Sequence, residues 1–158
     1  MKKILFAGFL IISLFFISCN SGNNDRAGLK SETGSEISSL NNELFKKLMF
    51  NYAPGKQWEN ASGKPIIIDF YADWCVPCRT LSPIVEDLAK EYAGKIVVYK
   101  VDIDKERELA ENMRITAVPT LMFIPAQGKP AVSRGLVSKE DLIQTINQLL
   151  LINKSEEL

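Results

Sequence analysis

Two cysteines separated by two residues, Cys75 and Cys78, are the side chains best placed to do chemistry in this sequence. Within one helical turn, such a pair can form and break a disulfide. The sequence contains no histidine and only one other cysteine, Cys19, so the pair lacks the further ligands that a zinc site requires. The spacing therefore predicts thiol–disulfide exchange. An inert structural disulfide is the alternative, although so small a loop would add little stability.

The two cysteines should have different roles, because a thiolate and not a thiol attacks a disulfide. Cys75 lies at the start of a predicted helix, where unpaired N–H groups and the helix dipole favour negative charge. We therefore expect Cys75 to be the exposed nucleophile that forms a mixed disulfide with the substrate. Cys78, one turn further along and more buried, should then attack the Cys75 sulfur and release the reduced substrate.

A carboxyl group lies inside the apolar run that precedes the cysteines, residues 66–71. A charged and unpaired carboxylate would be costly there, so we expect Asp69 to be neutral or partnered. Lys100, in the adjacent predicted strand, is the expected partner. A buried ion pair with a purely structural role is one interpretation of these two residues.

The surrounding elements predict a single α/β domain with a mixed central sheet flanked by helices. Residues 66–71 are apolar at successive positions, as expected of a central strand that is covered on both faces. We expect a first helix from Leu40 with Ser39 as its N-cap, and a last helix from Ser138 whose buried stripe includes Leu149. The expected order is helix, strand, helix, strand, helix, strand, strand and helix.

Residues 69–78 resemble the active-site segment of the thioredoxin family, with Val76 where most members carry glycine. The resemblance extends over about residues 45–151 and implies a thioredoxin-like fold. It also implies that Asp69 and Lys100 lie behind the cysteines and that Asp69 assists proton removal from Cys78. The catalytic set implied by the resemblance is Cys75, Cys78, Asp69 and Lys100.

The same resemblance implies a substrate-binding surface next to the cysteines. Val118-Pro119 resembles the family's cis-proline loop, in which the residue before the proline binds extended substrate through its backbone. A proline that merely opens a strand, a plain turn glycine at 135 and a core-packed Trp74 are the alternatives. The predicted substrate-binding residues are Trp74, Val76, Pro77, Val118, Pro119 and Gly135.

The first eighteen residues differ from the rest of the chain. Lys2 and Lys3 precede an uncharged apolar run, 4–17, which is too short to span a bilayer and fits the middle of a secretory signal. Ile17-Ser18-Cys19 is like a bacterial lipoprotein processing site. We expect cleavage before Cys19 and its lipidation, which would anchor the protein to a membrane. Ordinary signal cleavage nearby or an uncleaved anchor are the alternatives.

The predicted organisation has four parts: a signal peptide at 1–18, a flexible linker at 19–38, the thioredoxin-like domain at 39–152 and a polar tail at 153–158. The linker is poor in apolar residues and cannot bury enough surface to offset its ordering entropy. The formal net charge of zero argues against nucleic-acid binding. We expect a monomer with no cofactor apart from the redox-active Cys75–Cys78 disulfide and with no metal.

Together these features favour an extracytoplasmic, periplasmic reductase that acts on disulfide-containing exported proteins. The resemblance implies that a membrane thiol-transfer protein of the DsbD type supplies its electrons. Pro77 favours reduction over oxidation, whereas Val76 alters the motif on which that inference rests. The alternatives are an oxidant or isomerase in disulfide formation, and a non-catalytic binding module on the same fold.

Overall fold

The computed structural model describes residues 37–49 and 59–151 of the 158-residue chain. Its centre is a five-stranded mixed sheet in the order β1-β3-β2-β4-β5. Strands β1, β3 and β2 are parallel, and β4 runs antiparallel to β2 and β5. The strands are β1 (Ser38–Ser39), β2 (Ile66–Tyr71), β3 (Val97–Asp102), β4 (Thr120–Ile124) and β5 (Ala131–Arg134).

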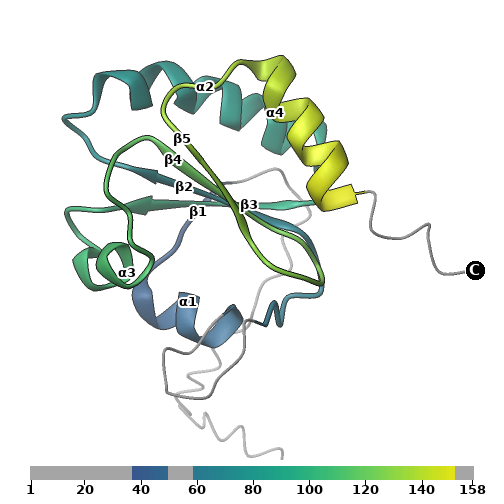
Figure 1. Cartoon of the computed structure of the whole chain (residues 1–158), viewed down its shortest axis with the longest axis horizontal. Coiled ribbons are helices and arrows are strands. Elements are labelled where there is room, and N and C mark those ends of the chain that lie inside the picture. The colour runs from purple at the N-terminus through teal and green to yellow at the C-terminus, as the bar shows by residue number, and fades with distance from the viewer. Residues whose placement is uncertain (1–36, 50–58, 152–158) are drawn as a thin grey trace, which may run out of the picture. The chain divides into compact units, whose positions relative to one another are not determined.

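Helices cover both faces of this sheet (Figure 1). One face carries α2 (Val76–Glu91) and α4 (Lys139–Thr145), which continues as a π-helix over Ile146–Leu151. The other face carries α1 (Asn42–Leu48) and α3 (Arg107–Asn112). The thioredoxin-like α/β arrangement predicted from the sequence is confirmed.

Strand β2 supplies side chains to two separate hydrophobic clusters. Ile66, Ile68 and Phe70 join the cluster beneath α1 and α3, whereas Ile67 joins the cluster beneath α2 and α4. Successive side chains of a strand point to opposite faces, so a strand buried on both faces must be apolar throughout. By the same alternation, Asp69 lies on the α2 side of the sheet.

The amino-terminal end of the domain differs from the prediction. Ser39 is not a helix cap but pairs with Lys100 as part of β1, and the described domain therefore begins within the predicted linker. The N-cap is Asn41, whose side-chain oxygen accepts a 2.8 Å hydrogen bond from the Leu44 N–H. Serine and asparagine are both common N-cap residues. Because the Ser38–Ser39 backbone pairs with β3, the helix begins after Asn41 and not after Ser39.

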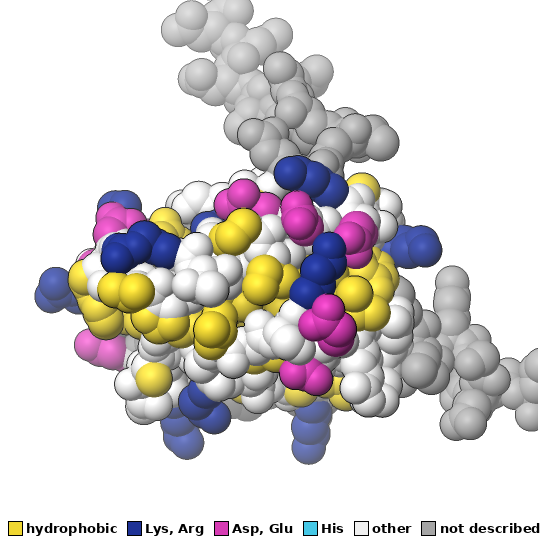
Figure 2. Space-filling model, turned by 90° about the horizontal axis from the view of Figure 1, so that it is seen from above, with side chains coloured by type: hydrophobic (Ala, Val, Ile, Leu, Met, Phe, Trp, Pro, Cys, Tyr) yellow, Lys and Arg dark blue, Asp and Glu magenta, His cyan; other side chains and the backbone are white. Residues whose placement is uncertain are grey.

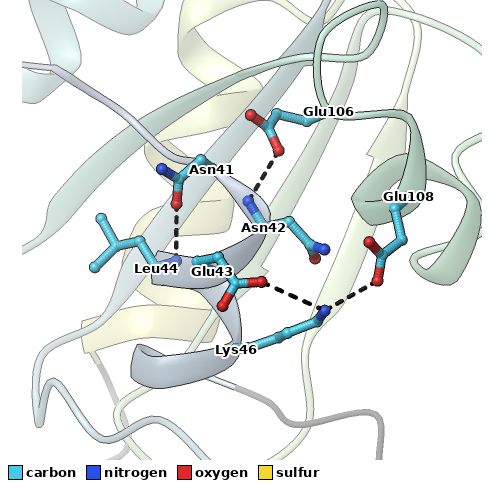
Figure 3. Close-up of polar contacts among 7 residues, drawn as sticks. All are labelled: Asn41, Asn42, Glu43, Leu44, Lys46, Glu106 and Glu108. Carbon is cyan, nitrogen blue, oxygen red and sulfur yellow. Dashed lines mark hydrogen bonds and ion pairs between the residues drawn. The ribbon is translucent and has the colours of Figure 1, made fainter.

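On the face of the sheet that carries α1 and α3, polar contacts join these two helices (Figure 3). The Asn42 backbone N–H donates a 2.9 Å hydrogen bond to Oε2 of Glu106. Lys46 Nζ lies 2.9 Å from Glu108 Oε1 and 3.8 Å from Glu43 Oε1. These contacts hold the first helix to the segment that follows β3.

The last helix begins as predicted, since Ser138 Oγ accepts from the Asp141 N–H at 3.1 Å. Its buried stripe is narrower than predicted. Leu142, Ile146 and Leu150 are buried, whereas Leu149 is an exposed large hydrophobic residue. A four-residue repeat places one side chain per turn against the sheet, which leaves Leu149 on the flank of the helix.

No helix within 37–49 or 59–151 is long and apolar enough to cross a membrane. The predicted signal peptide, Cys19, most of the predicted linker and the polar tail lie outside the described residues.

Candidate active site

The two cysteines lie where β2 ends and α2 begins. In Figure 1, β2 runs to the left and its chain turns upward into α2. Cys75 is the N-cap of α2, and its Sγ accepts a 3.2 Å hydrogen bond from the Cys78 N–H. The Cys75 N–H in turn donates to the Ala72 carbonyl at 3.1 Å. Backbone contacts on both sides therefore fix the position of Cys75 at the helix terminus.

Cys75 and Cys78 form a disulfide with an S–S distance of 2.07 Å and a Cα–Cα distance of 5.3 Å. Cys75 is only 3% exposed and Cys78 is 5% exposed. The prediction that Cys75 is exposed and that Cys78 is the more buried of the two is therefore wrong for the disulfide form. In the disulfide form, both cysteines pack in a small cluster with Ala72, and Val118 lies against it. The turn that makes Cys75 an N-cap also folds its sulfur back toward the helix.

The electrostatic surroundings of Cys75 favour an anion. Its sulfur already accepts one backbone N–H, and the first turn of α2 carries no acidic side chain. The positive end of the helix dipole therefore acts on this sulfur without a carboxylate nearby in the helix to offset it. A thiolate formed at Cys75 on reduction would be stabilised at this position.

An exposed rim surrounds the disulfide. Trp74 is 64% exposed and Val76 is 62% exposed, and Pro77 also lies at the surface. The Trp74 indole N–H donates a 2.8 Å hydrogen bond to Asp104 Oδ2, so the ring is held in place while its faces remain accessible. This exposure excludes the alternative of a core-packed Trp74.

The Val118-Pro119 loop lies beside the disulfide. Its peptide bond is cis, as the sequence resemblance implies, and Val118 packs against the cysteine cluster. The Gly135 N–H donates a 2.8 Å hydrogen bond to the Pro119 carbonyl, and Gly135 has a φ of 84°, which favours glycine. The structure thus brings residues 118, 119 and 135 together; substrate binding by them stays a prediction.

Asp69 is buried on the α2 side of β2, with only 2% of its surface exposed. Burial raises the pKa of this carboxyl to about 6, and the positive charge of Lys100 opposes part of that increase. Oδ1 has no hydrogen-bond partner among the residues that the structure describes. The carboxyl group is therefore poised to gain or lose a proton near neutral pH, as a general base requires.

Lys100 lies opposite Asp69 in the pairing of β2 with β3, as predicted. The expected ion pair between them is not formed within the described part of the chain. Instead, the Lys100 ammonium donates a hydrogen bond to Ser82 Oγ and lies 4.9 Å from the centre of the Tyr71 ring. The nearest turn of α2 thus offers the ammonium a polar partner that the strand sequences alone do not reveal.

A pocket of about 210 Å³ opens beside Cys78. Ser82, Lys100 and Tyr71 contribute to its lining. Cys78 and Lys100 therefore line one shared space at the edge of the site.

Ser82 and Asp104 contribute to the site but were not among the residues predicted for it. Ser82 follows Cys78 by four residues, one turn along α2, so helical spacing alone could have placed its hydroxyl on the same face. Asp104 is the second residue after the end of β3, at the edge of the sheet where Cys75 follows β2. The carboxyl ends of neighbouring parallel strands meet at one edge, which would have brought Asp104 close to the Trp74 rim.

Among the described residues, no group of three or more histidine, cysteine, aspartate or glutamate side chains is arranged to hold a metal ion. On the face that carries α2 and α4, basic and acidic side chains are interspersed with hydrophobic ones (Figure 2). This visible face has no large area of a single charge sign.

Comparison with known proteins gives consistent matches. The thioredoxin family model matches residues 53–148. A thioredoxin of Borreliella burgdorferi is 45% identical over 108 residues, which cover 68% of this chain and 92% of that relative. Thioredoxin 1 of Nostoc sp. is 39% identical over 89 residues, covering 56% of this chain and 83% of that protein.

A crystal structure of chloroplastic thioredoxin z superposes with a TM-score of 0.61 and 23% sequence identity. The match covers 72% of this chain and 93% of that structure. At this identity the likeness concerns the fold, and it agrees with the sheet order and helix layers described above.

Proposed function

Because this chain belongs to the thioredoxin family and is thus a thiol–disulfide oxidoreductase that reduces protein disulfides, we propose that its substrates are exported proteins. Cys75 is the nucleophile of this reaction and Cys78 is the resolving cysteine. The observation that carries the assignment of roles is the placement of Cys75 Sγ at the amino terminus of α2, where it accepts the Cys78 N–H.

The first step forms a bond between the substrate and Cys75. The Cys75 thiolate attacks one sulfur of the substrate disulfide, and the other substrate sulfur leaves as a thiolate. Trp74 and Val76 provide exposed apolar surface beside the sulfur. An extended substrate segment would lie across this rim and the Val118-Pro119 loop, pairing with the Val118 backbone.

The second step releases the reduced substrate. Cys78 loses its proton to the Asp69 carboxylate, and its thiolate attacks Cys75 Sγ. The Cys75–Cys78 disulfide forms as the bond to the substrate breaks, and the substrate sulfur leaves with the electron pair. Two electrons have then passed from the dithiol to the substrate, and the oxidised protein must be reduced again.

The extracytoplasmic, periplasmic location rests on the amino-terminal sequence. A short apolar run that follows two lysines and ends at Cys19 resembles a lipoprotein signal. Lipidation of Cys19 would hold the catalytic domain at a membrane surface. A membrane thiol-transfer protein of the DsbD type would then supply electrons to the Cys75–Cys78 disulfide.

A trapping experiment tests the proposed substrates. Cys78→Ser in the full chain, expressed in the native host, retains the nucleophile but cannot resolve its mixed disulfides. We expect it to accumulate covalent adducts that dithiothreitol releases, with exported proteins and a membrane thiol-transfer protein among the captured species. The double variant Cys75→Ser/Cys78→Ser is the matched control and should capture none. Capture of cytoplasmic proteins alone would contradict export.

The anchor is tested separately by Cys19→Ser. We expect this substitution to remove the protein from the membrane fraction. It should also prevent the incorporation of labelled fatty acid, because the acyl chains would be attached through Cys19. Thr80→Ala, on the exposed face of α2, should leave membrane attachment unchanged. Continued lipid labelling of the Cys19→Ser protein would show that this cysteine is not the attachment site.

A further inference from the structure

The polar groups of Asp69, Lys100 and Ser82 are arranged asymmetrically. Asp69 is buried, and its Oδ1 has no hydrogen-bond partner among the residues described by the structure. Lys100 lies opposite it in the strand register, and its positive charge acts on the Asp69 carboxyl. A buried carboxylate and an adjacent ammonium would ordinarily form a direct pair, which is not present here.

The Lys100 ammonium is instead held by α2. It donates to Ser82 Oγ, and the Ser82 hydroxyl donates to Glu86 Oε1 at 3.5 Å, one turn further along the helix. The Tyr71 ring provides a second contact for the cation, 4.9 Å from its centre. The Ser82 hydroxyl therefore links the cation to the exposed carboxylate of Glu86 on α2.

We propose that Ser82 is a positioning residue, which holds the Lys100 ammonium on α2 so that the Asp69 carboxyl stays unpaired and able to accept the Cys78 proton. This inference deepens the proposed function and rests on the role of Asp69 in the second step. It assigns no contact between Ser82 and the substrate. Ser82 acts through the position of the Lys100 ammonium.

The direction of the effect follows from the charges around Asp69. Lys100 on β3 is the charged group that acts on this carboxyl, and its charge lowers the pKa that burial raises. Leu121, opposite Asp69 on β4, is uncharged. A shorter distance between ammonium and carboxylate would stabilise the ionised form further and lower the pKa of Asp69.

The ammonium has room to move. The pocket of about 210 Å³ beside Cys78 is lined by both Ser82 and Lys100. Removal of the Ser82 hydroxyl would free the ammonium from α2, and Asp69, opposite Lys100 in the strand register, has an oxygen without a described hydrogen-bond partner. We therefore expect the loss of one hydroxyl to bring Lys100 to Asp69.

The central measurement is a carbon-13 NMR titration of the Asp69 carboxyl. In Ser82→Ala the pKa of Asp69 should fall by about 1 unit, the lower end of the shift that an adjacent opposite charge produces. Ser82→Thr keeps the hydroxyl and should restore the wild-type titration. Lys100→Gln should raise the pKa of Asp69, so the two substitutions should have opposite signs. An unchanged or raised pKa in Ser82→Ala would overturn the proposal.

Kinetics provide the second measurement. The rate at which a preformed Cys75 mixed disulfide is resolved should decline at acid pH, and in Ser82→Ala that decline should shift to lower pH by the same amount as the titration. An unshifted profile beside a lowered pKa of Asp69 would overturn the link to proton transfer. Asp69→Asn tests the underlying function independently. If this variant resolved the mixed disulfide at the wild-type rate at every pH, Asp69 would not be the base. The NMR titration of Asp69 in Ser82→Ala would still measure the effect of Ser82 on Lys100.

Discussion

Cys75→Ser is expected to lower the reduction of insulin disulfides to the rate of dithiothreitol alone. A serine hydroxyl at the start of α2 cannot replace a thiolate, because its proton is not lost near neutral pH. Cys78→Ser should also stop turnover, but for a different reason. Its Cys75 still attacks, so each molecule should retain one substrate chain as a mixed disulfide.

The two variants are distinguished by mass spectrometry after reaction with a disulfide-containing peptide. Cys78→Ser should gain the mass of one peptide thiol, and Cys75→Ser should gain none at early times. Thr80 is exposed on α2, two residues after Cys78, and Thr80→Ala should reduce the peptide at the wild-type rate. Rapid adduct formation on Cys75→Ser would reverse the assigned roles. Such a reversal would agree with the similar burial of the two cysteines in the disulfide form.

Asp69→Asn should stabilise the folded protein at neutral pH by about 2–3 kcal/mol. Burial raises the pKa of the Asp69 carboxyl from its ordinary value of 3.8 to about 6. Above pH 6 the folded protein must hold a buried carboxylate whose Oδ1 has no described partner. An amide of the same shape does not carry that charge.

The pH dependence has a definite sign. Between the two pKa values, the folded state binds a proton that the unfolded state has lost, so the stabilising contribution of Asp69 falls as pH rises. This contribution is complete below about pH 4 and lost above about pH 6. Urea denaturation of the wild type and Asp69→Asn should therefore agree at pH 4, diverge up to pH 6 and remain separated by a constant amount above it.

The same substitution should slow the resolution of mixed disulfides, because Cys78 loses its proton acceptor. The free energy of unfolding would thus increase while the rate of mixed-disulfide resolution falls. A substitution that merely disrupted the fold would lower both. Asp87→Asn, an exposed position on α2, provides the control and should show no comparable pH-dependent difference. A stability difference that is equal at pH 4 and pH 7 would contradict the raised pKa of Asp69.

Much of the fold could be predicted because its elements have strong local patterns. The unbroken apolar run of β2 predicts burial on both faces, and the observed split of Ile66, Ile67 and Ile68 between two clusters agrees with it. Strand β1 could not be predicted in this way. Ser38 and Ser39 are polar, and only the backbone of β3 gives them strand structure.

The candidate site was predictable to the extent that it lies in one stretch of sequence. The cysteine spacing places Cys75 at a helix start and Cys78 one turn later. Burial of Cys75 could not be foreseen, because it depends in part on Ile103 and Val118, which the fold brings against the disulfide. The position of the Lys100 ammonium likewise depends on how α2 lies over β3, a relation that strand pairing does not determine.

The direction of β1 bears on how the domain would meet large partners. Because β1 is parallel to β3 and β2, the chain enters the domain from the amino-terminal side of these strands, whereas Cys75 follows the carboxyl end of β2. Six residues of strand separate the two ends of β2 by about 20 Å. The chain therefore enters the described domain away from the disulfide, which leaves the Cys75 end of the sheet clear of the entering strand.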